Sequence, residues 1–338
     1  MRELQRELGL ERIVKLASNE GAFGPLPAAV AAFDAAAGEL NRYPDAGALR
    51  LREQLAALHG VPLEQVVVGN GADELIRLCA VATLDPGDSA AFFWPSFPSY
   101  VSAAACSGAE AIQVAAGDLD ALRDSGARLV YVANPNNPTG TLLDRGQVRA
   151  FVDALPAGTL CVLDEAYAEY ADPPPEGPAL LKEGLGPLCV LRTFSKVYGL
   201  AALRIGYALA SPEVADALDR VRPVFNVNQP AQEAAVASLH ERDAVGLRVQ
   251  HARDARALLH DAMAAAGLSP LSSQANFVYA EVPGGDGEGL ANALLREGFI
   301  VRALTGFGAP GAIRVTAGTN EENEEFAAAL ARVRGAAR

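Results

Sequence analysis

Lys196 is the residue whose chemistry stands out most in this sequence. Only three of the 28 basic residues are lysines, Lys15, Lys182 and Lys196, and the rest are arginines. Arginine keeps its charge in proteins, whereas a partly desolvated lysine has a lowered pKa and can form a Schiff base with a carbonyl. Lys196 lies among apolar and hydroxyl residues just after an apolar run. The alternative interpretation is an exposed lysine, and the scarcity of lysine weakens it.

Two other segments could hold an anion. The turn Gly69–Glu74 (GNGADE) follows an apolar run and opens a predicted helix, so its backbone N–H groups and the helix dipole favour a phosphate. Taken alone, it also fits an ordinary strand–helix turn with Asp73 as N-cap, and it matches neither the dinucleotide nor the P-loop fingerprint. Arg204, eight residues after Lys196, could bind a phosphate or a carboxylate, although taken alone it is more typical of a surface arginine.

Polar side chains also follow two further apolar runs. The string NPNNPTG (134–140) comes after the run 129–133, and DEAY (164–167) ends the run 159–163. Asparagine amides both donate and accept hydrogen bonds, and an acid at the end of a buried strand is costly unless a cation pairs with it. Ordinary turns and a solvated acid are the structural alternatives. Together, an amine, an acid for a pyridinium nitrogen, Asn and Tyr for a phenolate oxygen and an anion site are what pyridoxal phosphate needs.

These segments require a sheet to bring them together. Short β-rich runs predict strands at 66–68, 90–94, 111–114, 129–133, 159–163, 188–192 and 205–209, with helices between several of them at 73–84, 97–106 and 144–154. Near-continuous apolar strands separated by helices indicate an α/β unit whose mostly parallel sheet is covered on both faces. Ligands bind at the carboxyl ends of such strands, so the candidate groups can converge there.

The length of 338 residues favours two domains. The chain is predicted to be strongly helical from 212 to about 267, and a smaller α+β pattern follows, with strands at 276–282, 299–302 and 312–316 and helices at 288–297 and 320–334. We expect residues 41–230 to form the large α/β domain. Residues 1–40 together with 231–338 are expected to form the small one.

Composition excludes several classes of protein. Half of the residues are hydrophobic, which excludes a disordered chain, and the net charge of −13 argues against nucleic acid as a partner. No apolar stretch of about 18 residues and no signal peptide is found, so no membrane association is expected. The four cysteines form no C-x-x-C pair, and we expect buried, reduced thiols in a cytoplasmic protein without a metal site.

At this point the sequence resembles the class I/II, fold-type I aminotransferases that depend on pyridoxal phosphate, and more closely their histidinol-phosphate aminotransferase family. The matching strings run in family order: LASNE (16–20), NRYPD (41–45), GNGADE (69–74), NPNNPTG (134–140), DEAY (164–167), RTFSK (192–196), GLAALRIGY (199–207) and IRVTAGTNEEN (313–323). The resemblance implies a mostly parallel seven-stranded sheet in a large domain and a smaller α+β domain.

The resemblance also implies which residues contact the cofactor, pyridoxal 5'-phosphate. In chain order they are Tyr43 from the partner subunit, Ala72, Asp73, Phe97, Asn137, Asp164, Tyr167, Ser195, Lys196 and Arg204. Lys196, Asp164 and Tyr167 would be the catalytic residues: the lysine forms the aldimine and moves the proton, the acid pairs with the pyridine nitrogen, and the tyrosine binds the ring oxygen. Because Tyr43 reaches the neighbouring subunit's phosphate in this family, a homodimer with shared active sites is implied.

Substrate contacts are implied for Asn19, Arg302 and Arg314. Arg314 would bind the α-carboxylate in bidentate fashion, and Arg302 would bind the distal phosphate of histidinol phosphate. The implied reaction is ping-pong transamination between histidinol phosphate and 2-oxoglutarate in histidine biosynthesis. Three alternatives remain: an aromatic amino acid aminotransferase, a threonine-phosphate decarboxylase, and a non-catalytic regulator that senses the cofactor.

The sequence departs from the family pattern near the substrate pocket. Gly21-Ala22 stands where relatives usually have Asn-Pro after SNE. The segment before the KLASNE strand is also shorter than the arm of many relatives. Both departures bear on the part of the family's active site that selects the substrate or meets the partner subunit.

Overall fold

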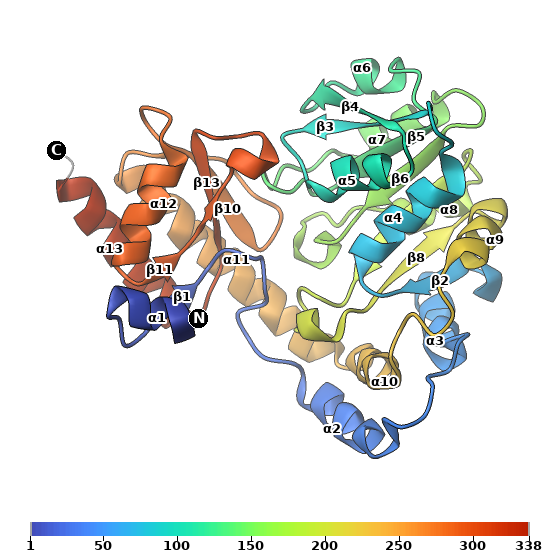
Figure 1. Cartoon of the computed structure of the whole chain (residues 1–338), viewed down its shortest axis with the longest axis horizontal. Helices are drawn as coiled ribbons and strands as arrows, with labels where there is room; N and C mark the ends of the chain where they lie inside the picture. The colour runs from blue at the N-terminus through green and yellow to red at the C-terminus, as the bar shows by residue number, and fades with distance from the viewer. Residues whose placement is uncertain (1, 337–338) are drawn as a thin grey trace.

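The computed structural model describes residues 2–336, and its largest element is a seven-stranded sheet (Figure 1). The strand order is β2-β8-β7-β6-β5-β3-β4. The strands are β2 (Val66–Gly69), β3 (Ser89–Trp94), β4 (Glu110–Ala115), β5 (Leu129–Ala133), β6 (Leu160–Asp164), β7 (Leu188–Thr193) and β8 (Gly206–Ala210). Strand β8 runs opposite to the other six strands, which all point the same way, so the expected mostly parallel sheet is confirmed.

Helices cover both faces of this sheet. Alternate residues of each strand enter two separate hydrophobic clusters, which explains why the strands read as continuous apolar runs. One face packs against α4 (Ala72–Thr83), α5 (Ser99–Cys106) and α9 (Pro212–Val221). The other packs against α3 (Leu49–His59), α7 (Arg145–Asp153), α8 (Gly177–Lys182) and α10 (Gln229–Ser238). Helix α2 (Pro27–Ala36) packs on α10 and joins this cluster through Ala29. The short helix α6 (Leu119–Arg123) also joins this second cluster.

A second, smaller layer of strands lies beside the first. The four-stranded sheet has the order β12-β13-β10-β9, and β1 pairs separately with β11. The strands of this layer, the separate pair included, are β1 (Val14–Lys15), β9 (Ser269–Pro270), β10 (Phe277–Glu281), β11 (Phe299–Ile300), β12 (Arg302–Ala303) and β13 (Ala312–Thr316). Its helices are α1 (Arg2–Leu8), α11 (Arg242–Ala265), α12 (Gly287–Arg296) and α13 (Asn320–Ala336). Five single 3₁₀ turns, η1 (Ala37–Glu39), η2 (Leu63–Gln65), η3 (Ala168–Tyr170), η4 (Ala201–Leu203) and η5 (Thr305–Phe307), complete the described elements.

The packing of α2 and α10 bears on the domain division. Both helices belong to the hydrophobic cluster of the large sheet, although the expected boundaries at 40 and 230 assign them to the small domain. The small sheet's cluster begins with Val14 and Leu16 and continues from Ala255, within α11. We therefore propose that the chain crosses between the domains at residues 18–25 and again within α11. Limited proteolysis tests this, since cleavage that separates α2 from the large domain would contradict it.

The cysteine and membrane expectations have different outcomes. Cys79, Cys161 and Cys189 are buried, but Cys106 is exposed, so the expectation of four buried thiols is wrong for Cys106. The reason is the helical period: Ala103 and Ala104 take the buried face of α5, which turns the last residue of that helix toward solvent. Among the described residues, no helix is long and apolar enough to cross a membrane.

Candidate active site

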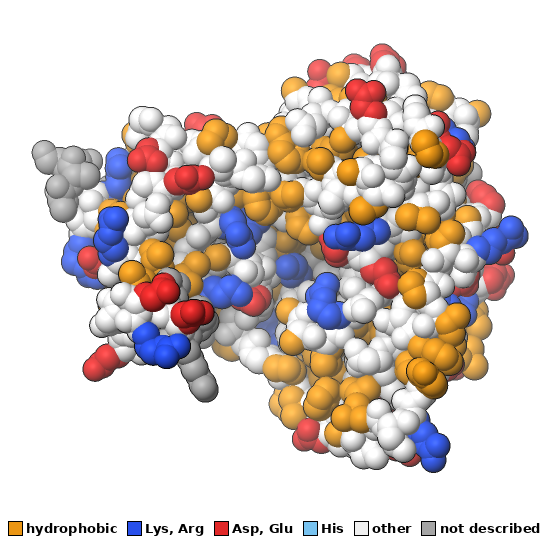
Figure 2. Space-filling view, viewed as in Figure 1, with side chains coloured by type: hydrophobic (Ala, Val, Ile, Leu, Met, Phe, Trp, Pro, Cys, Tyr) orange, Lys and Arg blue, Asp and Glu red, His pale blue; other side chains and the backbone are white. Residues whose placement is uncertain are grey.

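A cavity of about 350 Å³ lies at the edge of the large sheet that the carboxyl ends of β2, β5, β6 and β7 share. The predicted residues that line it are Asn19, Ala72, Asp73, Phe97, Asn137, Asp164, Tyr167, Ser195, Lys196, Arg204, Arg302 and Arg314. Figure 2 shows the molecule hollowed between its two lobes, with Lys and Arg side chains gathered along the hollow. The cavity therefore collects every predicted site residue except Tyr43.

Lys196 lies in the loop that follows β7. The loop turns back on itself because Gly199 N–H donates to the Lys196 carbonyl at 3.0 Å. The Lys196 Nζ lies 5.5 Å from the centre of the Tyr167 ring. Burial lowers the pKa of Lys196 to about 8, with Arg314 and Arg204 acting in the same direction. A substantial fraction of the amine is therefore neutral near physiological pH, which is the form that attacks a carbonyl.

Asp164 ends strand β6 and is 6% exposed. Its Oδ2 accepts a hydrogen bond from the Tyr100 hydroxyl at 2.8 Å, and its Oδ1 accepts one from Ala166 N–H at 3.1 Å. Burial raises the pKa of this carboxyl, while the two hydrogen bonds and Lys196 oppose that shift. A buried carboxylate held by donors, with a cationic amine nearby, is suited to pairing with a protonated ring nitrogen.

The N-terminus of α4 forms an anion site. Its N-cap is Gly71, with φ of 80° and no side-chain cap, so the first N–H groups of the helix have no partner within it. A Cβ on Gly71 would lie 2.5 Å from Arg204 Nη2, so only glycine leaves room for this guanidinium. A Cβ on Gly206 would lie 2.8 Å from Ala72 N. The turn, the helix end and Arg204 therefore pack as a cradle.

Two hydroxyl groups complete this cradle. Thr193 Oγ1 donates to Ser195 Oγ at 3.0 Å and accepts from Ser195 N–H at 3.1 Å. Arg204 itself has φ of 56°, a left-handed conformation that is rare outside glycine and that clusters at functional sites. Backbone N–H groups, hydroxyls and a guanidinium are the donors that a phosphate requires.

Arg314 and Arg302 lie at the side of the cavity formed by the small sheet. Arg314 is 3% exposed, its ring neighbours Phe277 and Phe307 lie 5.2 Å from its guanidinium carbon, and Nη2 donates to Ala17 O at 2.8 Å. Its Nε is buried with no hydrogen-bond partner in the described part of the chain. No carboxylate of residues 2–336 forms a salt bridge with either arginine. The pair therefore presents unneutralised charge to an anionic ligand.

Two separate hydrogen-bonded links join the large sheet's side of the cavity to the small sheet, one through Asn137 and one through Tyr167 and Asn19. Arg314 Nη1 donates to Asn137 Oδ1, which leaves the Asn137 amide protons for another acceptor. Asn19 Nδ2 donates to the Tyr167 hydroxyl at 2.8 Å, and Asn19 Oδ1 accepts from Thr316 Oγ1 at 3.1 Å. Asn137 and Tyr167 can thus donate to one ring oxygen. The amide of Asn19 is occupied in orienting Tyr167, and its contact with substrate stays a prediction.

Phe97 and Tyr43 differ in their positions. Phe97 lines the cavity with its ring edge-on to Tyr100, at 6.0 Å between centroids. Tyr43 is 82% exposed and stacks on Phe225 at 4.5 Å, outside the cavity of its own chain. A role for Tyr43 in a neighbouring subunit's site stays a prediction.

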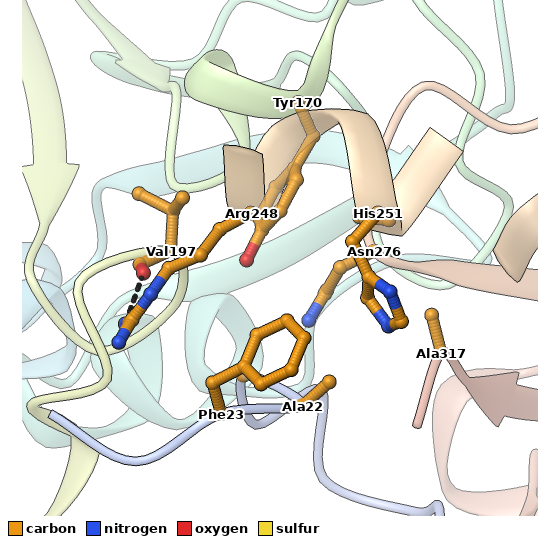
Figure 3. Close-up of a pocket in the computed structure, with 10 residues that line it drawn as sticks. Ala22, Phe23, Tyr170, Val197, Arg248, His251, Asn276 and Ala317 are labelled. Atoms are coloured by element: carbon orange, nitrogen blue, oxygen red, sulfur yellow. Dashed lines mark hydrogen bonds between the residues drawn. The ribbon is translucent and has the colours of Figure 1, made fainter. Parts of the chain in front are cut away.

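The strap Gly21–Phe23 explains one departure from the family pattern. A Cβ on Gly21 would lie 2.9 Å from the Lys196 carbonyl oxygen, so this position leaves no room for a side chain. Figure 3 shows Phe23 between Arg248 and His251, and its ring lies 4.7 Å from the histidine ring. Arg248 donates to Val197 O at 3.0 Å and to Gly24 O at 2.7 Å. Arg248 thus links the residue that follows the strap to the Lys196 loop.

Sequence reasoning missed several residues that line the cavity. Tyr100, Thr193, Glu20 and Phe307 line it, and none was singled out. The signal for Tyr100 was its place three residues after Phe97, across the turn that opens α5, where the Tyr100 N–H donates to the Phe97 carbonyl at 3.2 Å. Phe307 lies in the turn η5, which follows strand β12 of the small sheet. No local sequence pattern predicts that its side chain lines the cavity at the large sheet.

Taken together, the donors fit pyridoxal phosphate. The cradle of α4 and Arg204 supplies a phosphate site, Asp164 a ring-nitrogen partner, and Asn137 and Tyr167 donors for a ring oxygen. Lys196 supplies an amine whose pKa is lowered to about 8. The buried Arg314 Nε without a partner supplies a site for a carboxylate or phosphate on the substrate.

Comparison with known proteins agrees with this geometry. A family model described as aminotransferase class I and II matches residues 11–330. A histidinol-phosphate aminotransferase of Anaeromyxobacter sp. (strain Fw109-5) is 45% identical, covering 99% of this chain and 94% of that protein. One of Moorella thermoacetica is 40% identical, covering 97% of this chain and 87% of that protein.

Solved structures share the fold. A crystal structure of histidinol-phosphate aminotransferase from Sinorhizobium meliloti in complex with pyridoxal-5'-phosphate has a TM-score of 0.92 at 30% identity, covering 100% of this chain and 95% of that chain. An aspartate aminotransferase of Thermus thermophilus has a TM-score of 0.86 at 24% identity, covering 98% and 94%. The expected fold-type I architecture is confirmed. The chain belongs to the family of class I and II aminotransferases.

Proposed function

We propose that this protein is a pyridoxal-phosphate-dependent transaminase that transfers the amino group of histidinol phosphate to 2-oxoglutarate in histidine biosynthesis, with ping-pong kinetics. Relatives named histidinol-phosphate aminotransferase at 40–45% identity over nearly the whole chain support the reaction. The observation that carries the choice of substrate is the pair Arg302 and Arg314.

The two arginines are direct cross-strand partners. Arg302 of β12 and Arg314 of β13 share one register position, and both line the cavity. Like charges directly opposite one another across two strands destabilise a sheet. Burial lowers the pKa of Arg314 to about 10, and the charge of Arg302 acts in the same direction. A ligand with two negative charges removes that cost. Histidinol phosphate carries a phosphate dianion where an amino acid carries a single carboxylate, so it suits this pair better than an aromatic amino acid does.

Lys196, Asp164 and Arg314 have different roles in the proposed reaction. Bound pyridoxal phosphate supplies an aldehyde that takes up the amino group and a ring that withdraws electrons from the reacting carbon. Lys196 Nζ would take the proton from the substrate carbon that bears nitrogen, acting as general base. As general acid it would then return that proton to the carbon of the cofactor's aldehyde group. Asp164 holds the ring nitrogen protonated, and Arg314 binds the carboxylate of 2-oxoglutarate in the second half of the cycle.

We also infer that the active enzyme is a homodimer with shared sites. Support comes from a group of large apolar side chains that are exposed in the single chain: Val30, Phe33, Leu40, Tyr43, Val224 and Phe225. Exposed apolar area of this kind marks interaction surfaces. Light scattering is expected to give twice the chain mass. Tyr43→Ala is expected to weaken cofactor binding, and a fully active monomer would contradict the proposal.

A cytoplasmic location is proposed as well, because that compartment keeps thiols reduced. Cys79 and Cys189 test this location, because both are buried and their Sγ atoms lie 3.8 Å apart. Alkylation of cell extracts at the moment of lysis should trap both as free thiols. Recovery of a Cys79–Cys189 disulfide under those conditions would contradict the proposal.

A panel of amino donors tests the choice of substrate. Cofactor-loaded enzyme is supplied with 2-oxoglutarate and, in turn, histidinol phosphate, phenylalanine, tyrosine or threonine phosphate, and glutamate and carbon dioxide are measured. We expect glutamate formation to be fastest with histidinol phosphate. A higher kcat/KM for an aromatic donor, or release of carbon dioxide from threonine phosphate, would overturn the proposal.

A further inference from the structure

Tyr100 occupies a buried aromatic cluster next to the cavity. Its ring is fully buried and stacks face to face on Tyr131, with centroids 4.7 Å apart and planes 10° apart. Phe92 packs at 5.7 Å, and Phe97 meets it edge-on at 6.0 Å. A ring enclosed on these sides has one orientation, so its hydroxyl is aimed by packing.

The hydroxyl of Tyr100 is directed at Asp164. It donates to Asp164 Oδ2 at 2.8 Å, which leaves Oδ1 with the N–H of Ala166. We propose that Tyr100 is a positioning residue that acts through Asp164, fixing the carboxylate toward the cofactor's ring nitrogen and keeping it ionised. This inference rests on the proposed cofactor. It also implies that one side chain sets the position of both Asp164 and the stacking ring of Phe97.

The surroundings of Asp164 show why such a donor is needed. Burial raises the pKa of this carboxyl, and the nearby charge of Glu165 acts in the same direction. The groups that favour the ionised form are the Tyr100 hydroxyl from α5, the N–H of Ala166 and the cation of Lys196. Burial and the charge of Asp164 hold the pKa of Tyr100 well above its usual value, so the hydroxyl remains a donor at any pH used for assay.

Tyr100→Phe removes the hydroxyl and keeps the ring, and Tyr131→Phe is its matched control. Tyr131 lies in the same cluster, is fully buried, and donates to Ile76 O at 2.8 Å rather than to Asp164. Equilibrium dialysis against pyridoxal phosphate across a pH series is the main readout. A lost hydrogen bond to a charged group predicts about tenfold weaker binding for Tyr100→Phe.

The direction of the pH effect distinguishes positioning from simple destabilisation. Loss of a donor to the carboxylate raises the pKa of Asp164. Cofactor affinity plotted against pH should therefore begin to fall, on the acid side, about one unit higher in pH, and this fall is called the acid limb below. Tyr131→Phe should lower thermal stability to a similar degree without moving that limb. An unchanged limb in Tyr100→Phe, or an equal movement in Tyr131→Phe, would overturn the inference.

A double-mutant cycle tests whether Tyr100 acts through Asp164. In an Asp164→Asn background the carboxylate is absent, so adding Tyr100→Phe should weaken cofactor binding by less than about twofold. A further tenfold loss would mean that Tyr100 acts independently, and the inference would be wrong. Turnover of histidinol phosphate does not enter these measurements. If the wild-type protein binds the cofactor but does not transaminate histidinol phosphate, the proposed substrate is wrong. The effect of Tyr100→Phe on cofactor binding can still be measured in that case.

Discussion

The lowered pKa of Lys196 allows a sharp test, because the chain has only three lysines. Competitive acetylation with a limiting amount of acetic anhydride modifies neutral amines in proportion to their abundance. The perturbation is pH, varied from 6 to 11, on protein freed of cofactor. Peptide mass spectrometry then separates the labelling of Lys196 from that of Lys15 and Lys182.

The expected magnitude follows from the site. With a pKa of about 8, compared with an ordinary value of 10.5, half of Lys196 is neutral at pH 8. An ordinary lysine is about 0.3% neutral at that pH, so the neutral fractions differ by about 150-fold. An added peptide with one unperturbed lysine provides the reference. Labelling of Lys196 should reach half its maximum near pH 8.

Two variants test the cause of the shift. Arg314 lowers the pKa of Lys196, so Arg314→Gln should move the labelling midpoint to higher pH. Asp164 acts in the opposite direction, so Asp164→Asn should move the midpoint to lower pH. A labelling midpoint near pH 10.5 in the wild-type protein would refute the argument that burial and neighbouring charges lower the pKa of Lys196. The same midpoint in the wild-type protein and in both variants would refute it as well.

Three further predictions concern other parts of the site. Arg302→Ala should raise KM for histidinol phosphate by about tenfold or more and leave KM for aromatic donors nearly unchanged, as steady-state kinetics would show. Gly206→Ala places a Cβ 2.8 Å from Ala72 N, so dialysis should detect at least about tenfold weaker cofactor binding; unchanged binding would argue against the cradle. Glu165→Gln removes the 2.6 Å ion pair with the largely buried Arg192 and leaves that arginine only Glu169 at 3.9 Å. Urea unfolding should therefore show a loss of about 3 kcal/mol, and a loss below about 1 kcal/mol would contradict this.

Much of the large sheet could be predicted from sequence, and the reason is physical. Strands buried on both faces must be apolar throughout, so runs such as LVYVA at 129–133 mark them directly. The direction of β8 could not be predicted, because an apolar run has the same composition in either direction. The packing of α2 on α10 also escaped prediction, since the two helices lie about 200 residues apart in the sequence.

The site was predictable where residues sit at strand ends. Asp164 ends β6 and Lys196 lies three residues after β7, and parallel strands bring their carboxyl ends to one edge. Tyr100 was missed because a buried tyrosine in a helix resembles core packing, and only its contact with Asp164 reveals more. The need for glycine at position 21 was also invisible, since it depends on the nearby carbonyl of Lys196.

A single-turnover half-reaction tests the central claim most directly. Cofactor-loaded enzyme is mixed with excess histidinol phosphate in the absence of any oxo acid, and the cofactor's absorbance is followed. We predict complete conversion to the amino form of the cofactor, and recovery of the starting spectrum with one glutamate per site when 2-oxoglutarate is added. Lys196→Ala should not convert. Conversion by Lys196→Ala at the wild-type rate, or none by the wild-type enzyme, would contradict the account.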